Sequence, residues 1–217
     1  MQIHELLDRL ELISPNNTFF TDLRKTILNN DQFALFRLLQ QQTSSQLVEG
    51  LRKYKDNTEF NADCFSRGQL ESKLWLVKEL QKTKVDLGTV FLCAGWYATL
   101  ATMLFESSIT VDKIRSFDID DTCRAIAETF NKPWVKDNWK FKSSTKDIMD
   151  INYEFERYEV IRADGTTCPL DDTPDTIINT SCEHIENFEE WYAKIPVGKL
   201  VILQSNNFFD VDEHVNC

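Results

Sequence analysis

Glycine and proline are scarce in this sequence, with 6 and 5 copies in 217 residues. Both counts lie well below average usage, which is about 7% for glycine and about 5% for proline. The shortage excludes collagen-like and low-complexity chains, and it favours long helices joined by few tight turns. Each glycine is therefore a candidate for a position where the backbone needs the absence of a side chain.

Positive charge is also in short supply, because 24 Lys and Arg residues face 35 Asp and Glu residues, a net charge of −11. An acidic surface repels phosphate backbones, so we expect no nucleic-acid partner. No apolar run approaches the ~18 residues of a membrane-spanning helix. The N-terminus lacks the basic stretch and apolar run of a signal peptide. We therefore expect a cytoplasmic protein without a membrane partner.

Metal-ligand spacings are missing as well. The six cysteines never form a Cys-x-x-Cys pair, and the three histidines, His4, His184 and His214, do not complete a zinc-binding pattern. We interpret the cysteines as reduced, small core residues and expect no metal ion.

The first part of the sequence, residues 1–62, has apolar residues at three- and four-residue steps and no strand signals, so we expect a helical N-terminal region. Helices are predicted around residues 3–13, 20–27, 33–39 and 47–51. A further helix, over 70–81, leads into a second domain that we place at residues 63–217.

From Thr89 onwards, short apolar runs alternate with helical segments. Strands are predicted at residues 90–92, 114–117, 139–141, 176–178 and 199–203, helices at 98–105, 122–130 and 188–193, and a hairpin over 153–170. Alternating strands and helices, with strands apolar on both faces, indicate a parallel sheet wrapped by helices. The expected fold class is therefore α/β, with a Rossmann-like sheet.

Candidate binding residues follow the first strand, in Cys93-Ala94-Gly95-Trp96-Tyr97. In open parallel sheets, ligands bind beyond the carboxyl ends of the strands, and a glycine there lets a ligand approach the backbone. The alternative is a tight strand-to-helix turn with no ligand.

An acidic residue, Asp118, ends the second strand, 25 positions after Cys93 (118 − 93). A carboxylate at this place can accept hydrogen bonds from both hydroxyls of a ribose. The alternative is that it caps the following helix, although Asp120 or Asp121 can fill that role. Beyond the third strand, the Asp147 side chain and the Ile148 N–H could bind the edge of an adenine, unless Asp147 is a solvated loop acid.

This ordered set resembles the class I S-adenosylmethionine-dependent methyltransferases over roughly residues 65–210. The matching segments are Val90–Trp96, Ser116–Asp120, Lys146–Ile148 and Asp175–Asn179. The resemblance implies S-adenosylmethionine as cofactor, with Gly95 near its methionine part, Asp118 at the ribose and Asp147 at the adenine. It also implies cofactor contacts for Cys93, Trp96, Tyr97, Ile119, Ile148 and Asn179. The loop departs from the usual Gly-x-Gly-x-Gly, since it keeps one glycine.

The family's sheet ends with two further strands, for which the 14 residues after Leu203 (217 − 203) are too few. We therefore expect these strands to be missing or supplied by another polypeptide. An uncovered sheet edge invites pairing with a partner or with a second copy, so homo- or hetero-oligomers are expected there.

Reactive residues are expected after the fourth strand, in Asn179–His184, where the family places them. His184 could act as the proton acceptor, and Glu183 or Asn179 could orient the methyl acceptor or the cofactor amine. The alternative is that both belong to the start of the next helix. Before residues 70–81, Arg67 could bind the methionine carboxylate with help from Lys73, or simply begin the helix in solvent.

We therefore expect an S-adenosylmethionine-dependent methyltransferase acting on a small-molecule or protein acceptor. Two alternatives remain open: a cofactor-binding or assembly subunit without turnover, and a nicotinamide-dependent oxidoreductase.

Overall fold

The computed structural model describes residues 18–29, 46–54, 60–162, 164–206 and 214–215. The chain divides into two compact units, Met1–Phe60 and Asn61–Cys217. In the first unit, helices α2 (Thr18–Leu28) and α4 (Gln46–Tyr54) confirm two of the predicted helices. The helices predicted around residues 3–13 and 33–39 lie outside the described residues. Among the described residues, no helix has the length and apolarity needed to cross a membrane.

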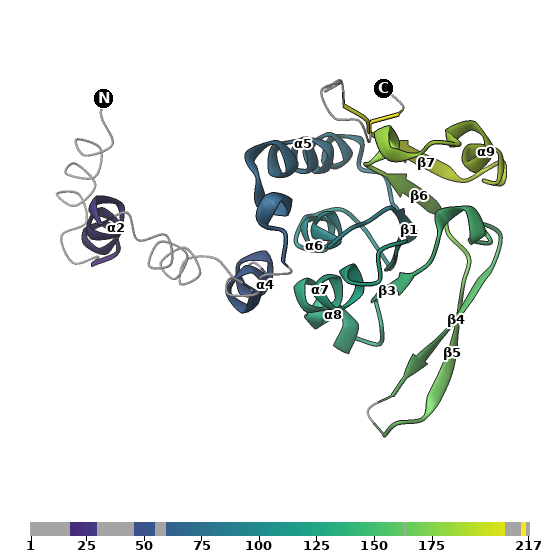
Figure 1. The fold of residues 1–217 in the computed structure, drawn as a ribbon, viewed down its shortest axis with the longest axis horizontal. Helices are drawn as coiled ribbons and strands as arrows, with labels where there is room; N and C mark the ends of the chain where they lie inside the picture. Colours follow the sequence, from purple (N-terminus) through teal and green to yellow (C-terminus); the bar gives the residue numbers. More distant parts are fainter. Residues whose placement is uncertain (1–17, 30–45, 55–59, 163, 207–213, 216–217) are drawn as a thin grey trace. The chain divides into compact units, whose positions relative to one another are not determined.

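A five-stranded parallel sheet forms the centre of the second unit, in the order β3-β2-β1-β6-β7 (Figure 1). Its strands are β1 (Thr89–Cys93), β2 (Lys113–Asp118), β3 (Phe141–Thr145), β6 (Thr176–Asn179) and β7 (Leu200–Leu203). The chain builds outwards from β1 to β3 and then crosses to β6 on the other side of β1. The fold is therefore the predicted α/β, Rossmann-like class, with its switch point between β1 and β6.

Helices cover both faces of this sheet, with α5, α6 and α7 on one side and α9 on the other (Figure 1). The helices are α5 (Arg67–Thr83), α6 (Thr99–Phe105), α7 (Cys123–Phe130), α8 (Lys132–Lys136) and α9 (Phe188–Ala193), with short 3-10 turns η1 (Ala62–Phe65), η2 (Ile148–Asp150) and η3 (Cys182–His184). On the α9 side, Trp191 is fully buried against Phe91, Phe117 and Ile177 of the sheet. Burial on both faces explains the continuous apolar run in β1, whereas β2 and β3 also bury polar residues such as Arg115 and Lys142.

The predicted third strand, 139–141, was placed too early. Asn138 and Trp139 have left-handed backbones, with φ of 50° at each, which a strand cannot accommodate. The strand therefore begins at Phe141 and continues to Thr145. Helix α8, which begins with Pro133 in its first turn, was not predicted.

A hairpin of β4 (Glu156–Ile161) and β5 (Thr167–Asp172) projects from the sheet as a separate antiparallel pair (Figure 1). Its base is held by a buried ion pair, in which Arg115 Nε of β2 donates to Asp172 Oδ2 at 2.7 Å. Arg115 Nε also donates to the Tyr158 hydroxyl, which donates in turn to Asp172. Burial alone would raise the pKa of Asp172, but the Tyr158 hydrogen bond and the Arg115 charge outweigh it and lower that pKa.

Strand β7 forms one edge of the sheet in the described part of the chain, and it pairs with β6. Its residues Leu200 and Leu203 are 37% and 41% exposed. Association through this edge stays a prediction.

Candidate functional site

The carboxyl ends of four strands bring most of the predicted residues to one edge of the sheet. In the strand register, Cys93 lies between Phe117 of β2 and Asn179 of β6. Asp118 of β2 pairs with Thr145 of β3 in the same way. The segments that follow these residues therefore meet beyond the switch point, where open α/β sheets bind ligands.

The loop after β1 lies directly against the end of β2. The Gly95 N–H donates to the Phe117 carbonyl at 3.0 Å, and a Cβ added at Gly95 would come within 2.2 Å of Ser116 Oγ. Ala94, Trp96 and Ala98 have left-handed backbones, with φ of 51°, 49° and 51°. Left-handed backbone at non-glycine residues costs energy and is concentrated at functional sites.

Asp118 is held in place by two backbone amides. Its Oδ2 accepts a hydrogen bond from the Trp96 N–H at 2.7 Å, and its Oδ1 accepts one from the Asp120 N–H at 3.1 Å. Burial raises its pKa, although these hydrogen bonds oppose the shift. Each carboxylate oxygen keeps one further acceptor position, so the side chain can still receive two hydroxyls.

The helix-capping alternative for Asp118 is not what the structure shows. Asp120 Oδ1 accepts hydrogen bonds from both the backbone N–H and the hydroxyl of Thr122, just before α7. Asp118 is thus turned towards the loop after β1 instead.

Apolar and polar groups lie on the neighbouring segments. The side chain of Ile119, directly after Asp118, is 72% exposed although it is apolar. The Lys146 N–H donates to the Asp118 carbonyl at 2.8 Å, which places Asp147 beside this segment. Asp147 Oδ1 accepts from the Met149 N–H at 2.9 Å, and the adjoining Ile148 is buried.

Asn179 ends β6 with a side chain that is fully buried. Its Oδ1 accepts a hydrogen bond from the Ser181 N–H at 2.8 Å. Its Nδ2 is buried and has no hydrogen-bond partner in the described structure, and the same holds for Ser116 Oγ on β2, two strands away. A buried polar atom left without a partner costs about 1–3 kcal/mol, and such atoms need an explanation. A bound ligand would supply one.

Two predicted side chains lie in the core. Cys93 Sγ lies 3.5 Å from the Tyr153 hydroxyl, and burial raises its thiol pKa to about 12. Tyr97 packs edge-on against Phe130, and its hydroxyl accepts from the Asn61 N–H at 3.2 Å. Both side chains point into the core, so any ligand contact from these positions comes from the backbone.

Arg67 of α5 was expected to bind the methionine carboxylate with help from Lys73, but the structure places the two side chains differently. The Arg67 side chain is 87% exposed and pairs with Glu71 on its own helix at 2.7 Å. Lys73 is half-buried, donates to Gln69 and interacts electrostatically with Glu183, and burial lowers its pKa. Lys73 is therefore the cation of α5 that lies near the site, although sequence reasoning gave it only a helping role.

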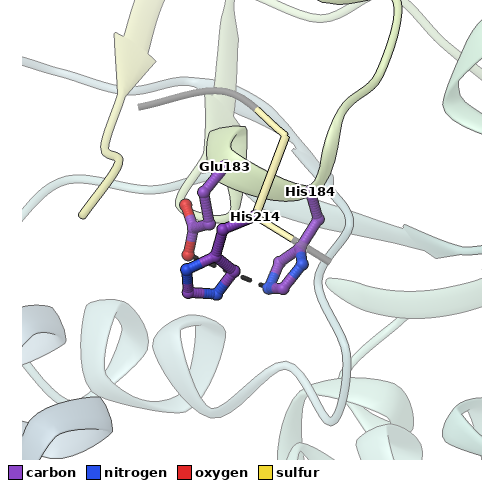
Figure 2. Close-up of side chains that lie close together, drawn as sticks. All are labelled: Glu183, His184 and His214. Carbon is purple, nitrogen blue, oxygen red and sulfur yellow. Dashed lines mark ion pairs between the residues drawn. The ribbon is translucent and has the colours of Figure 1, made fainter. Parts of the chain in front are cut away.

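Glu183 and His184 lie together on η3, as their adjacent positions require. Glu183 Oε1 accepts a hydrogen bond from Asn206 Nδ2 at 2.7 Å and lies 3.9 Å from His184 Nε2. The His184 ring packs against that of His214, with centroids 4.8 Å apart (Figure 2). His214 was missed, because it lies 30 positions after His184 (214 − 184) and no local pattern connects them.

Comparison with known proteins adds only a likeness of fold. No protein-family model matches the chain, and no curated protein matches it. The chain is similar to the solved structure of an S-adenosylmethionine-dependent methyltransferase from Clostridium acetobutylicum, with 12% identity and a TM-score of 0.40 over 60% of this chain and 48% of that one.

Two further similar structures are the small RNA methyltransferase HEN1 and a geranyl diphosphate methyltransferase. HEN1 matches at 12% identity and a TM-score of 0.49, over 74% of this chain and 21% of its own. The geranyl diphosphate enzyme matches at 12% identity and a TM-score of 0.43, over 62% of this chain and 44% of its own. The chain spans less than half the length of each of these three structures.

Proposed function

We propose that the second unit binds S-adenosylmethionine at the carboxyl edge of its sheet, and that the chain transfers the methyl group to a small-molecule or protein acceptor. The observation that carries this proposal is the placement of Asp118. Its carboxylate is fixed by the Trp96 and Asp120 amides, beside a loop that only glycine allows to lie so close to β2.

The residues present fit such a ligand. Asp118 would accept both ribose hydroxyls, Ile119 would cover one face of the adenine, and Asp147 with the Ile148 N–H would bind its edge. The buried Asn179 Nδ2 would donate to an acceptor on the methionine part. The half-buried Lys73 is a better partner for the methionine carboxylate than the exposed Arg67.

S-adenosylmethionine supplies an electrophilic methyl group on a sulfonium when it is bound. The chain then has two tasks, which are to align the acceptor and to receive its proton. We assign proton acceptance to the exposed imidazole of His184, with Glu183 beside it.

Calorimetric titration with S-adenosylmethionine tests the proposal. We expect Asp118→Asn to weaken binding at least about tenfold, because an amide cannot accept from both hydroxyls as a carboxylate does. The matched control is Asp121→Asn, an exposed acid of the same turn, which should leave affinity unchanged. Circular dichroism of both variants checks that the loop still folds.

Product detection separates two of the functions left open, the methyltransferase and the cofactor-binding subunit without turnover. Formation of S-adenosylhomocysteine with a small-molecule or protein acceptor supports the enzyme. Tight binding of S-adenosylmethionine without turnover on any acceptor supports the alternative of a cofactor-binding subunit. Equal affinity of wild type and Asp118→Asn would contradict the site itself.

A further inference from the structure

A carboxylate and two imidazoles converge on one point beyond the end of β6. Glu183 and His184 come from η3 and His214 comes from the C-terminal stretch, and each offers one ligand atom to the cluster (Figure 2). We propose that these three residues bind a divalent transition-metal ion. This inference goes beyond the proposed function and does not depend on S-adenosylmethionine binding; with the ion bound, the coordinated nitrogen of His184 would no longer be available as a proton acceptor.

The spacing of the three ligand atoms suits a cation better than direct hydrogen bonds. Glu183 Oε1 and His184 Nε2 are 3.9 Å apart, which is too long for a hydrogen bond. All three ligand atoms lie within 4.8 Å of one another. Metal–ligand bonds of about 2.1 Å place the ligand atoms of a tetrahedral site about 3.4 Å apart. The widest pair of ligand atoms therefore has to close by at most about 1.4 Å, which side-chain rotation can supply.

The state of Glu183 is an independent sign of a missing ligand. Its side chain is only 9% exposed, yet its Oε2 is buried with no hydrogen-bond partner among the residues described. A buried carboxylate without full compensation is costly. The other oxygen, Oε1, accepts from Asn206 and is the one that lies 3.9 Å from His184 Nε2, so an outer hydrogen bond orients the carboxylate oxygen that faces this imidazole.

Backbone pairing explains how residues so far apart in sequence come together. The Val215 N–H donates to the Glu183 carbonyl at 2.8 Å, directly beside His214. The Gln204 N–H donates to the Asn179 carbonyl at 2.9 Å, and the Cys182 N–H donates to the Gln204 carbonyl at 3.3 Å. These bonds join the C-terminal stretch to η3, so the cluster is part of the fold.

The donor set narrows the choice of ion. Two imidazoles and one carboxylate suit Zn²⁺, Co²⁺, Fe²⁺ or Mn²⁺, whereas Mg²⁺ and Ca²⁺ prefer oxygen donors alone. Three protein ligands leave coordination positions open, as in sites that also bind a substrate group.

Titration of the full chain with Co²⁺, after treatment with a chelator, tests the site. We expect one Co²⁺ per chain, with visible absorption bands of nitrogen and oxygen ligation. Glu183→Gln, His184→Asn and His214→Asn should each weaken binding at least tenfold. Glu186→Gln, an exposed acid three positions from Glu183, is the matched control and should bind as wild type does.

Two results would overturn the proposal: Co²⁺ affinity unchanged in His214→Asn, or absorption dominated by thiolate ligation. Because a variant could fail to fold, histidine-labelled wild-type protein provides a second measurement by NMR. Co²⁺ should shift or broaden two of the three imidazole signals, and unchanged signals at one equivalent would exclude the site. No S-adenosylmethionine is present in these experiments, so their failure is distinct from failure of the proposed function.

Discussion

Gly95 occupies the point where the loop after β1 passes closest to β2. A Cβ at this position would come within 2.2 Å of Ser116 Oγ and 3.2 Å of Leu92 Cγ. We expect Gly95→Ala to lower the free energy of unfolding by about 1–3 kcal/mol, the usual cost of overpacking. Ser116→Ala should be nearly neutral, because the hydroxyl it removes is buried without a partner in the described structure.

The double variant Gly95→Ala/Ser116→Ala should recover most of the lost stability, since the atom in conflict has gone. Urea unfolding followed by circular dichroism measures all three variants. If Gly95→Ala unfolded at the same urea concentration as wild type, the close approach of the loop to β2 would be refuted.

The location of a site residue could be predicted where the residue directly ends a strand. Asp118 and Asn179 are examples, because the end of a strand in a parallel sheet defines which edge they reach. Side-chain direction was not predictable in the same way. Cys93 and Tyr97 point into the core, and Arg67 points into solvent. Those directions depend on which neighbours each side chain packs against, and local sequence does not contain them.

At the scale of elements, the buried Arg115–Asp172 ion pair is one of the contacts that hold the base of the β4–β5 hairpin, beside Lys113–Asp172 and Lys146–Glu156. The side chains of Arg115 and Asp172 are 2% and 3% exposed. Removing one partner of a buried pair leaves a charge without compensation, so Asp172→Asn should lower the free energy of unfolding by about 3–5 kcal/mol. Asp171→Asn is the matched control, because its ion pair with Arg157 is exposed, so this substitution should change the free energy of unfolding much less.

The loss of unfolding free energy in Asp172→Asn should depend on pH, because the pKa of Asp172 is lowered in the folded protein. A carboxyl whose pKa is lower in the folded state stabilises the fold fully above its unfolded value, about 3.9. That stability is lost as the pH falls through the folded pKa. The free energy of unfolding of wild type should therefore exceed that of Asp172→Asn by a constant amount from about pH 7 to about pH 5. This gap should narrow below about pH 3.9. A constant difference at all pH values would contradict the pairing.

The predicted strand boundaries agree with the structure where the strand is an uninterrupted or nearly uninterrupted apolar run. The predicted 90–92, 114–117, 176–178 and 199–203 fall within or next to β1, β2, β6 and β7. The third strand was misplaced, because Trp139 is apolar and aromatic but lies in a left-handed turn. The buried Arg115 inside β2 gave no local hint of its partner, since Asp172 lies 57 residues away.

At the scale of the whole molecule, residues 61–217 contain the complete five-stranded sheet and every candidate site residue. A compact unit with its own core should fold alone. We expect this fragment to unfold cooperatively and to bind S-adenosylmethionine within about threefold of the affinity of the full chain. Thermal unfolding and calorimetry of the two proteins measure this. A fragment without a cooperative transition would show that residues 1–60 take part in the fold of the second unit.

The sequence by itself determined the α/β class, four of the five strands of the sheet, and the carboxylate at the end of the second strand. Helices and strands can be predicted locally, because the spacing of apolar residues along the chain reflects which faces of each element are buried. Only the tertiary structure decided the anchoring of the hairpin by Arg115, the nearness of Lys73 to Glu183, and the meeting of His184 with His214. Such contacts join residues far apart in the chain, and their free energy depends on packing that exists only once the sheet has formed.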